Sequence, residues 1–234
     1  YCELEKHDVA QDIVTKVLYL NKHFIYAHLL QAKLYLRQGK YQEATKIVDN
    51  AIKLDSSCAE AYKYKATILA AQGLKNRSID NAKIAVSLQP ANHKYYAFLA
   101  KLYFDAQEYD NAFLYYKEAS MLDELNVDYL YNAALAADKD DDFVNASNYY
   151  SYALRQEPFN NLIIYEYVDL LKRHNRLKQA LNLLKSKIDT VDSENVEKVL
   201  KQKYKELKAE DEQPFFKKVG KYFTSTMHRI FPRA

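Results

Sequence analysis

Hydrophobic residues recur at helical spacing along most of this chain, in runs separated by short polar breaks. In residues 93–126, one apolar run covers 96–103 and a second covers 109–122, with a polar break at 105–108. Apolar residues three and four apart lie on one face of a helix, so the pattern predicts two antiparallel helices joined by a short turn. The pattern returns when the window is shifted by 34 residues, which is typical of a repeat array.

Five copies of this unit follow one another without insertion or deletion, at residues 25–58, 59–92, 93–126, 127–160 and 161–194. Two helices that pack closely need small side chains where their backbones approach. Twelve of the fifteen residues at the three expected small positions are alanine. These residues stand at position eight (Ala32, Ala66, Ala100, Ala134, Val168), position twenty (Ala44, Ser78, Ala112, Ala146, Ala180) and position twenty-seven (Ala51, Ala85, Ala119, Ala153, Lys187).

Glycine and proline mark the places where the predicted helices end. Gly39 and Gly73 stand at position fifteen of their copies, where the first helix must stop and the chain must turn. Pro90 and Pro158 stand at position thirty-two, where the second helix cannot continue. A unit of this kind cannot bury its apolar face alone, so neighbouring units are expected to stack.

This pattern resembles the tetratricopeptide repeat family, over residues 25–194. The resemblance implies an all-α fold, a right-handed superhelix (α-solenoid) of antiparallel helix pairs in 34-residue repeats, with the first helices on the concave face. The sequence departs from the family at position four, where the usual Trp is absent, and at Lys187, where a small residue is expected. We therefore expect the fifth repeat to pack differently at its outer end.

Three further segments flank the repeats. Residues 1–24 match the second helix of a truncated repeat and its turn, so we expect a C-terminal piece of a longer protein whose upstream signal or anchor is not visible. Residues 195–209 are predicted to form a polar helix that caps the last repeat. Residues 210–234 are predicted to form a hinge and a basic amphipathic C-terminal helix.

The family resemblance also implies which side chains face the concave groove. Basic residues in its first half and apolar anchors beside them favour an acidic or amphipathic partner segment, bound as a peptide or helix. The alternative is that the apolar residues pack on the neighbouring first helix and that the lysines are only solvated. The candidate partner-binding residues are Tyr26, Leu29, Lys33, Arg37, Lys63, Thr67, Lys94, Lys101, Tyr131 and Tyr165.

Family members that bind chaperones hold a C-terminal carboxylate with a clamp of Lys, Asn, Asn, Lys and Arg. In repeats one to three, only one cation stands where the clamp requires it, so a chaperone co-factor role is disfavoured. The corresponding residues are Leu29, Lys33, Tyr64, Lys94 and Phe98.

The C-terminal segment places apolar residues on one helical face and lysines beside it. It could pack on the repeats of its own or a neighbouring molecule, lie on an anionic membrane, or bind another protein. We favour packing within the protein, which leaves self-association open. The residues concerned are Phe216, Val219, Phe223, Met227 and Ile230 on the apolar face and Lys217, Lys218 and Lys221 beside it.

Composition narrows the class of protein. With 49% hydrophobic residues, three Gly and four Pro, the chain suits a large helical core and not an all-β fold. No apolar run approaches the roughly 20 residues that span a bilayer. Two cysteines far apart in the sequence, Cys2 and Cys58, argue against a disulfide scaffold, and this count fits the reducing compartment of a cytoplasmic protein. A net charge of +3 is too balanced for a surface that tracks nucleic-acid phosphates.

Catalytic and metal chemistry find little support in the sequence. The six histidines show no metal-binding spacing, and three glycines cannot build a phosphate-binding loop. The acidic run 138–142 is most simply a turn that caps a helix. We therefore predict a non-catalytic scaffold or adaptor in a multi-protein assembly, with no cofactor and no metal. The alternative is a peripheral membrane adaptor whose C-terminal helix docks to anionic lipid.

Overall fold

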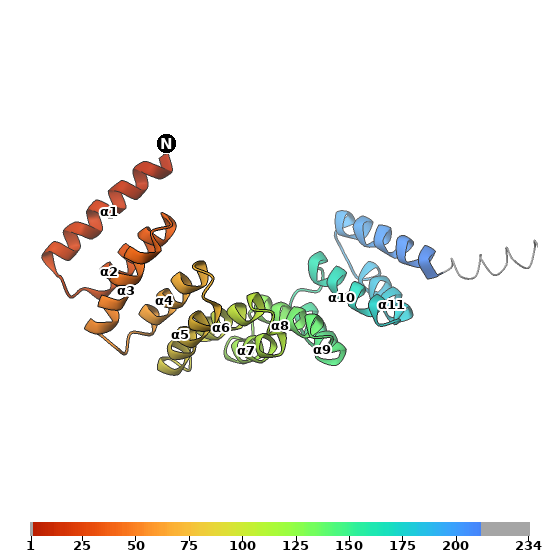
Figure 1. Cartoon of the computed structure of the whole chain (residues 1–234). Helices are drawn as coiled ribbons and strands as arrows, with labels where there is room; N and C mark the ends of the chain where they lie inside the picture. The colour runs from red at the N-terminus through yellow and green to blue at the C-terminus, as the bar shows by residue number, and fades with distance from the viewer. Residues whose placement is uncertain (1, 212–234) are drawn as a thin grey trace, which may run out of the picture. The chain divides into compact units, whose positions relative to one another are not determined.

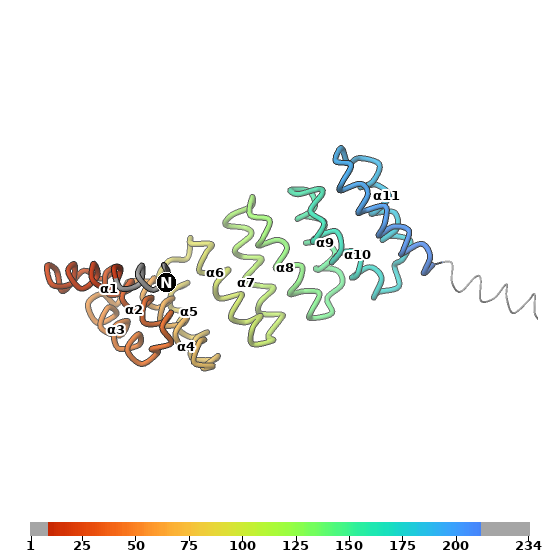
Figure 2. The backbone as a smooth tube through the Cα atoms, turned by 90° about the horizontal axis from the view of Figure 1, so that it is seen from above, coloured from red at the N-terminus to blue at the C-terminus, as the bar shows by residue number. Residues whose placement is uncertain are grey.

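The computed structural model describes residues 2–211, with side chains from Val9 onward. Twelve helices and no strand make up this part of the chain, which confirms the predicted all-α class. Consecutive helices run back and forth, joined by short turns (Figures 1 and 2). The helices are α1 (Cys2–Leu20), α2 (Ile25–Arg37), α3 (Tyr41–Leu54), α4 (Ala59–Ala71), α5 (Lys75–Leu88), α6 (His93–Asp105), α7 (Tyr109–Leu122), α8 (Val127–Lys139), α9 (Phe143–Gln156), α10 (Asn161–Arg173), α11 (Leu177–Ile188) and a last helix at residues 194–211.

The helix boundaries repeat with the period that the sequence predicts. The first helices α2, α4, α6, α8 and α10 begin at residues 25, 59, 93, 127 and 161, and each has 13 residues. This regularity confirms the predicted 34-residue repeat of helix pairs.

The turn inside each repeat has the same backbone conformation in all five copies. Position fifteen has a positive φ, between 57° and 76°, whichever residue occupies it. Only glycine reaches this left-handed region without a steric cost. The residues at this position are Gly39, Gly73, Gln107, Asp141 and Asn175.

The chain divides into two compact units, Tyr1–Asp140 and Asp141–Ala234. Within the described residues, unit 1 contains α1 to α8 and unit 2 contains α9 to α11 with the last helix. The division falls in the turn between the two helices of the fourth repeat.

In unit 1, each helix packs on the next, both within a repeat and between repeats. The small residues at positions eight, twenty and twenty-seven are fully buried there, as close helix packing requires. Larger side chains fill the spaces beside them: Ala32 and Ala44 lie in one cluster with Val48 and Ile68. Ser78 replaces alanine at position twenty of the second repeat, and its hydroxyl donates a 2.8 Å hydrogen bond to the carbonyl of Ala66.

In unit 2, the last helix packs against α10. It buries Leu200 and Leu207 completely or nearly so, and the Glu210 carboxylate lies 2.6 Å from the ammonium of Lys172 on α10. Lys187 of α11, where the other repeats have alanine, is half-buried with its ammonium 5.8 Å from the centre of the Phe159 ring. Burial lowers the pKa of this lysine.

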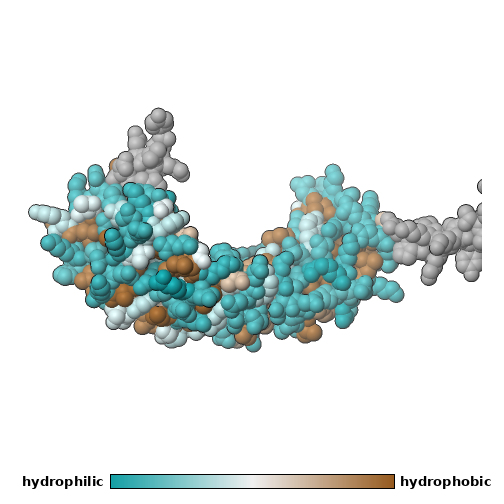
Figure 3. Space-filling view, in the orientation of Figure 1, coloured by the Kyte–Doolittle hydropathy of each residue, from teal (hydrophilic) through white to brown (hydrophobic). Residues whose placement is uncertain are grey.

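The molecular surface mixes polar and apolar side chains. On the face seen in Figure 3, hydrophobic side chains form separate spots among hydrophilic ones. No helix in residues 2–211 combines the length and apolar character needed to cross a membrane.

Candidate functional site

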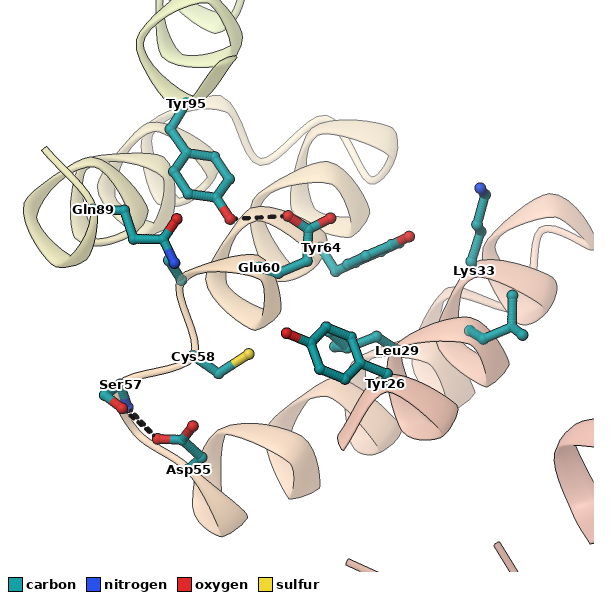
Figure 4. A pocket seen from close by; sticks show the side chains of 12 residues that line it. Tyr26, Leu29, Lys33, Asp55, Ser57, Cys58, Glu60, Tyr64, Gln89 and Tyr95 are labelled. Carbon is teal, nitrogen blue, oxygen red and sulfur yellow. Dashed lines mark hydrogen bonds between the residues drawn. The ribbon is translucent and has the colours of Figure 1, made fainter. Parts of the chain in front are cut away.

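A hollow of about 530 Å³ opens in unit 1 on the side formed by first helices (Figure 4). We call it the Tyr26 hollow. Side chains from α2, α4, α6 and two inter-repeat turns converge on it. Its lining comprises Tyr26, Leu29, Leu30 and Lys33 of α2, Asp55, Ser57 and Cys58 of the turn before α4, Ala59, Glu60 and Tyr64 of α4, Gln89 of the turn before α6, and Tyr95 of α6.

Helical periodicity decides which residues of α2 reach the hollow. Tyr26, Leu30 and Lys33 are spaced by four and three residues, so they lie on one helical face. Tyr26 is 66% exposed and Leu30 is 44% exposed, so both offer apolar surface to an occupant. Leu29 is 2% exposed and packs in a core cluster with Ala51 and Ala61, which places it at the base of the hollow.

The Glu60 carboxylate connects two elements of the hollow, α4 and α6. One of its oxygens accepts a 2.9 Å hydrogen bond from the Tyr95 hydroxyl, and the other lies 3.2 Å from the ammonium of Lys63. Burial, together with this carboxylate, raises the pKa of Tyr95 far above its ordinary value. Burial first, and then the Glu60 charge, also raises the pKa of Tyr64. Both phenols are therefore neutral at physiological pH.

The turn that leads into α4 is held by a local hydrogen-bond pair. The carboxylate of Asp55 accepts from the backbone N–H of Ser57 at 2.8 Å and from its hydroxyl at 2.6 Å. These bonds, the hydroxyl first, lower the pKa of Asp55. The turn presents the Cys58 thiol at the edge of the hollow (Figure 4).

The structure places three of the predicted partner-binding residues in the Tyr26 hollow, namely Tyr26, Leu29 and Lys33. Lys63 lies next to it and pairs with Glu60, a lining residue. Thr67 is half-buried, and its hydroxyl donates to the backbone carbonyl of Lys63 at 2.9 Å. That hydroxyl is thus already engaged within α4.

The remaining candidates are spread over other elements. Arg37 is exposed at the end of α2, and Lys94 is exposed at the start of α6. The ammonium of Lys101 lies 3.3 Å from the carboxylate of Asp105, on the same helix. Tyr131 is half-buried on α8. None of these four lines the Tyr26 hollow.

Tyr165 belongs to unit 2 and lies beside the last helix. It lines a second hollow of about 510 Å³ together with Lys198, Val199, Gln202, Lys203 and Glu206 of the last helix. The ammonium of Lys203 lies 5.3 Å from the centre of the Tyr165 ring. Lys203 also lies 3.6 Å from the carboxylate of Asp169. The last helix therefore supplies most of the lining around the one predicted anchor of unit 2.

Nine of the twelve residues that line the Tyr26 hollow were not among the predicted partner-binding residues, and they include Leu30, Glu60, Tyr64 and Tyr95. Leu30 and Tyr64 both stand at position six of their repeats, which shares a helical face with positions two and nine. That spacing is the signal that could have found them. The predicted residues of the C-terminal segment, from Phe216 to Ile230, lie outside the described residues.

The described part of the chain brings no three His, Cys, Asp or Glu side chains into an arrangement that could hold a metal ion. The lining of the Tyr26 hollow consists mainly of aromatic, aliphatic, polar and charged side chains. Such a surface can bind another molecule through burial and hydrogen bonds.

Comparison with known proteins agrees with the predicted resemblance. Residues 29–92 match a family model described as tetratricopeptide repeat. A search of curated proteins found no match. The match at 29–92 covers all of α3, α4 and α5 and most of α2, so it includes most of the Tyr26 hollow.

Several solved structures share the fold. YrrB, described as a TPR protein with an unusual peptide-binding site, is 18% identical with a TM-score of 0.61, over 81% of this chain and 97% of that one. The C-terminal part of a TPR repeat-containing protein from Cytophaga hutchinsonii is 15% identical with a TM-score of 0.66, over 80% and 75% of the two chains. Yeast Tom70 is 16% identical with a TM-score of 0.57, over 86% of this chain and 43% of Tom70. Together with the family match, these structures confirm the resemblance to the tetratricopeptide repeat family.

Proposed function

We propose that this chain is a non-catalytic scaffold or adaptor in a multi-protein assembly, and that the Tyr26 hollow binds a peptide or helical segment of a partner protein. Tetratricopeptide repeat proteins are generally scaffolds for protein–protein interaction. The observation that carries the proposal is the hollow itself. It combines about 530 Å³ of space with exposed apolar surface on Tyr26 and Leu30. Pockets of about 300–1,000 Å³ with apolar walls and a few polar groups are typical binding sites.

The charges around the hollow support a partner segment that carries acidic residues. Lys33, Arg37 and Lys94 are exposed and make no ion pair within the described residues, so their ammonium and guanidinium groups are available to a partner. Lys63 and Lys101 differ, because Glu60 and Asp105 already pair with them. We therefore propose that Lys33 and Arg37, on the same helix as Tyr26, orient the acidic part of the segment.

Photo-crosslinking in native lysate tests this proposal. A benzoylphenylalanine replaces Leu30, which is 44% exposed at the hollow, and a second chain carries it at Leu114 of α7, which is 52% exposed elsewhere. We expect a protein adduct at position 30 that is absent at position 114 and that disappears when Tyr26→Asp is added. Identical adducts at both positions, or adducts insensitive to Tyr26→Asp, contradict the proposal.

A double charge reversal, Lys33→Glu with Arg37→Glu, tests the orienting role. Neither residue has an acidic partner in residues 9–211, so the reversal breaks no internal ion pair. We expect the adduct at position 30 to be lost in this variant. The matched control is Lys53→Glu, an exposed residue in the last turn of α3, and it should leave the adduct intact.

A second candidate function rests on the sequence of the C-terminal segment. Residues 214–234 carry five Lys or Arg, no acid, and a Phe-rich apolar face, which is the composition of helices that lie on anionic membranes. We propose a peripheral membrane adaptor as the alternative. Co-sedimentation with vesicles containing phosphatidylserine, with and without residues 214–234, separates the two. Tail-dependent, salt-sensitive binding supports the alternative, and no binding contradicts it.

A further inference from the structure

The Tyr26 hollow places a carboxylate among three tyrosine side chains. Glu60 lies on α4, between Tyr26 of α2 and Tyr95 of α6, and Tyr64 stands one helical turn after it (Figure 4). Each oxygen of an ionised carboxylate can accept about two hydrogen bonds. The hydroxyl of Tyr95 and the ammonium of Lys63 supply one each. The carboxylate can therefore accept further donors from an occupant of the hollow.

Lys63 shows which chemical group this arrangement attracts. Its ammonium lies 3.2 Å from a Glu60 oxygen and 5.9 Å from the centre of the Tyr95 ring. A carboxylate beside an aromatic face is a favourable environment for a cation, because the charge and the ring quadrupole both attract it. The Lys63 side chain is 34% exposed, so it can move aside into solvent when a partner cation arrives.

Tyr64 and Tyr95 keep their neutral form, which preserves this environment. Burial and the Glu60 charge raise the pKa of Tyr64 and of Tyr95 above the ordinary value of a phenol. A neutral phenol can donate a hydrogen bond to Glu60 and offers its ring face to a cation.

The other charged groups of the lining leave the centre of the hollow to Glu60. The carboxylate of Asp55 is engaged by the backbone and hydroxyl of Ser57 in its own turn. The Lys33 side chain extends away from Cys58, and the Tyr64 side chain is drawn between Lys33 and Glu60 (Figure 4). A side chain that enters between Tyr26 and Tyr95 can therefore reach the Glu60 carboxylate, where it competes with the Lys63 ammonium.

We propose that the Tyr26 hollow receives a lysine or arginine side chain of the partner segment, with its charged end on Glu60 and its aliphatic stem against Tyr26 and Leu30. This inference rests on the proposed function and deepens it, because it names the anchor residue of the partner. The acidic residues of the same segment face Lys33 and Arg37.

The spacing along α2 sets the distance between the anchor and these acidic residues. Lys33 and Arg37 follow Tyr26 by seven and eleven residues, which corresponds to about 10 and 17 Å along a helix that rises 1.5 Å per residue. An extended peptide advances about 3.3 Å per residue. The partner motif is thus a basic residue with an acidic residue roughly three to five positions away.

Selection from a phage-displayed library of random dodecapeptides on the full chain tests this motif. We expect enriched peptides to carry Lys or Arg at one position and Asp or Glu at the stated spacing. A synthetic peptide of the consensus should bind Glu60→Gln about tenfold more weakly in fluorescence anisotropy, because one charge-assisted contact is lost. The control Glu43→Gln, an exposed residue in the first turn of α3, should bind as the parent chain does.

Lys63→Met gives an independent readout, because it removes the internal competitor for Glu60. We expect this variant to bind the consensus peptide several-fold more tightly. Thermal melting followed by circular dichroism establishes that each variant is folded, and glutamine at position 60 keeps an oxygen that can accept from Tyr95.

The outcomes separate this inference from the proposed function. Enriched peptides without a basic residue, or a consensus peptide that binds Glu60→Gln unchanged, overturn the cationic anchor and leave peptide binding standing. No enrichment, or enriched peptides whose binding survives Tyr26→Asp, overturns both.

Discussion

The hydroxyl of Tyr95 donates a 2.9 Å hydrogen bond to the carboxylate of Glu60, 35 residues earlier in the chain. This bond joins the first helix of the third repeat to the first helix of the second. The same two side chains line the Tyr26 hollow. One contact therefore links neighbouring repeats and shapes the candidate binding surface.

Tyr95→Phe should lower the free energy of unfolding by about 1–2 kcal/mol, because it removes a hydrogen bond to a charged group and leaves the ring packing on Ala59 and Ala85 intact. Urea denaturation followed by circular dichroism measures this change. Tyr26→Phe is the control, since that ring is 66% exposed, and its effect should stay within about 0.5 kcal/mol. Equal losses in the two variants would show that the hydrogen bond contributes nothing specific.

Gln107→Gly should raise the free energy of unfolding by about 0.5–1 kcal/mol, because Gln107 has a φ of 66°, where a side chain is strained. The gain is the steric relief less the greater entropy of glycine in the unfolded chain. Gln72→Gly is the matched control. Its φ of −83° suits any residue, so the change should be neutral or destabilising. The melting temperatures of the two variants should therefore move apart, and a shift of Gln107→Gly downwards would contradict the argument.

The turns show why the sequence revealed the fold well. Gly39 and Gly73 marked the turn in two repeats, and the conserved spacing of small residues extended the same register over Gln107, Asp141 and Asn175. Asp141 and Asn175 are residue types that tolerate a positive φ, whereas at Gln107 only the 34-residue period indicates the turn geometry. Close helix contacts require small residues, and this requirement recurs in five successive copies. Such a regular pattern of small residues rarely arises by chance.

The hollow was harder to predict, because it depends on residues far apart in the chain. Tyr26 and Tyr95 belong to different repeats, and only the packing of α2, α4 and α6 brings them to the same site. Family positions placed Leu29 in the groove, and the structure makes it a buried base with its neighbour Leu30 exposed. A shift of one residue turns a side chain by about 100° around a helix, which a pattern with period 3.6 resolves poorly.

Ala100→Leu should lower the free energy of unfolding by about 1–3 kcal/mol or more, because the added atoms must enter a fully packed contact at position eight. Ala71→Leu, at the exposed end of α4, is the control with the same change in volume. It should shift stability by less than about 0.5 kcal/mol. Chemical denaturation distinguishes them, and comparable effects would mean that the alanines are not at close contacts.

Leu200→Ala should destabilise unit 2, because Leu200 is completely buried where the last helix packs against α10. Removal of a buried leucine typically costs about 2–5 kcal/mol. Val199→Ala, the adjacent residue with 42% exposure, should cost much less. Hydrogen exchange of the α10 amides provides the local measurement: protection should fall in Leu200→Ala and remain in Val199→Ala. Unchanged protection in both would mean that the last helix does not support α10.

The stability of the chain should fall at alkaline pH through Tyr116, a buried residue of α7. Burial first, and then the charge of Asp105, raises the pKa of Tyr116 to about 12. In the unfolded chain a tyrosine ionises near pH 10, so between pH 10 and 12 the folded state binds more protons than the unfolded state. The stabilisation is therefore fully present below pH 10 and is lost as the pH rises through 12.

We expect the free energy of unfolding to fall by about 1–2 kcal/mol more in the parent chain than in Tyr116→Phe between pH 9 and 11.5. Other buried tyrosines such as Tyr95 are present in both chains, so the difference between their urea midpoints isolates Tyr116. Parallel pH profiles would contradict a raised pKa at this residue.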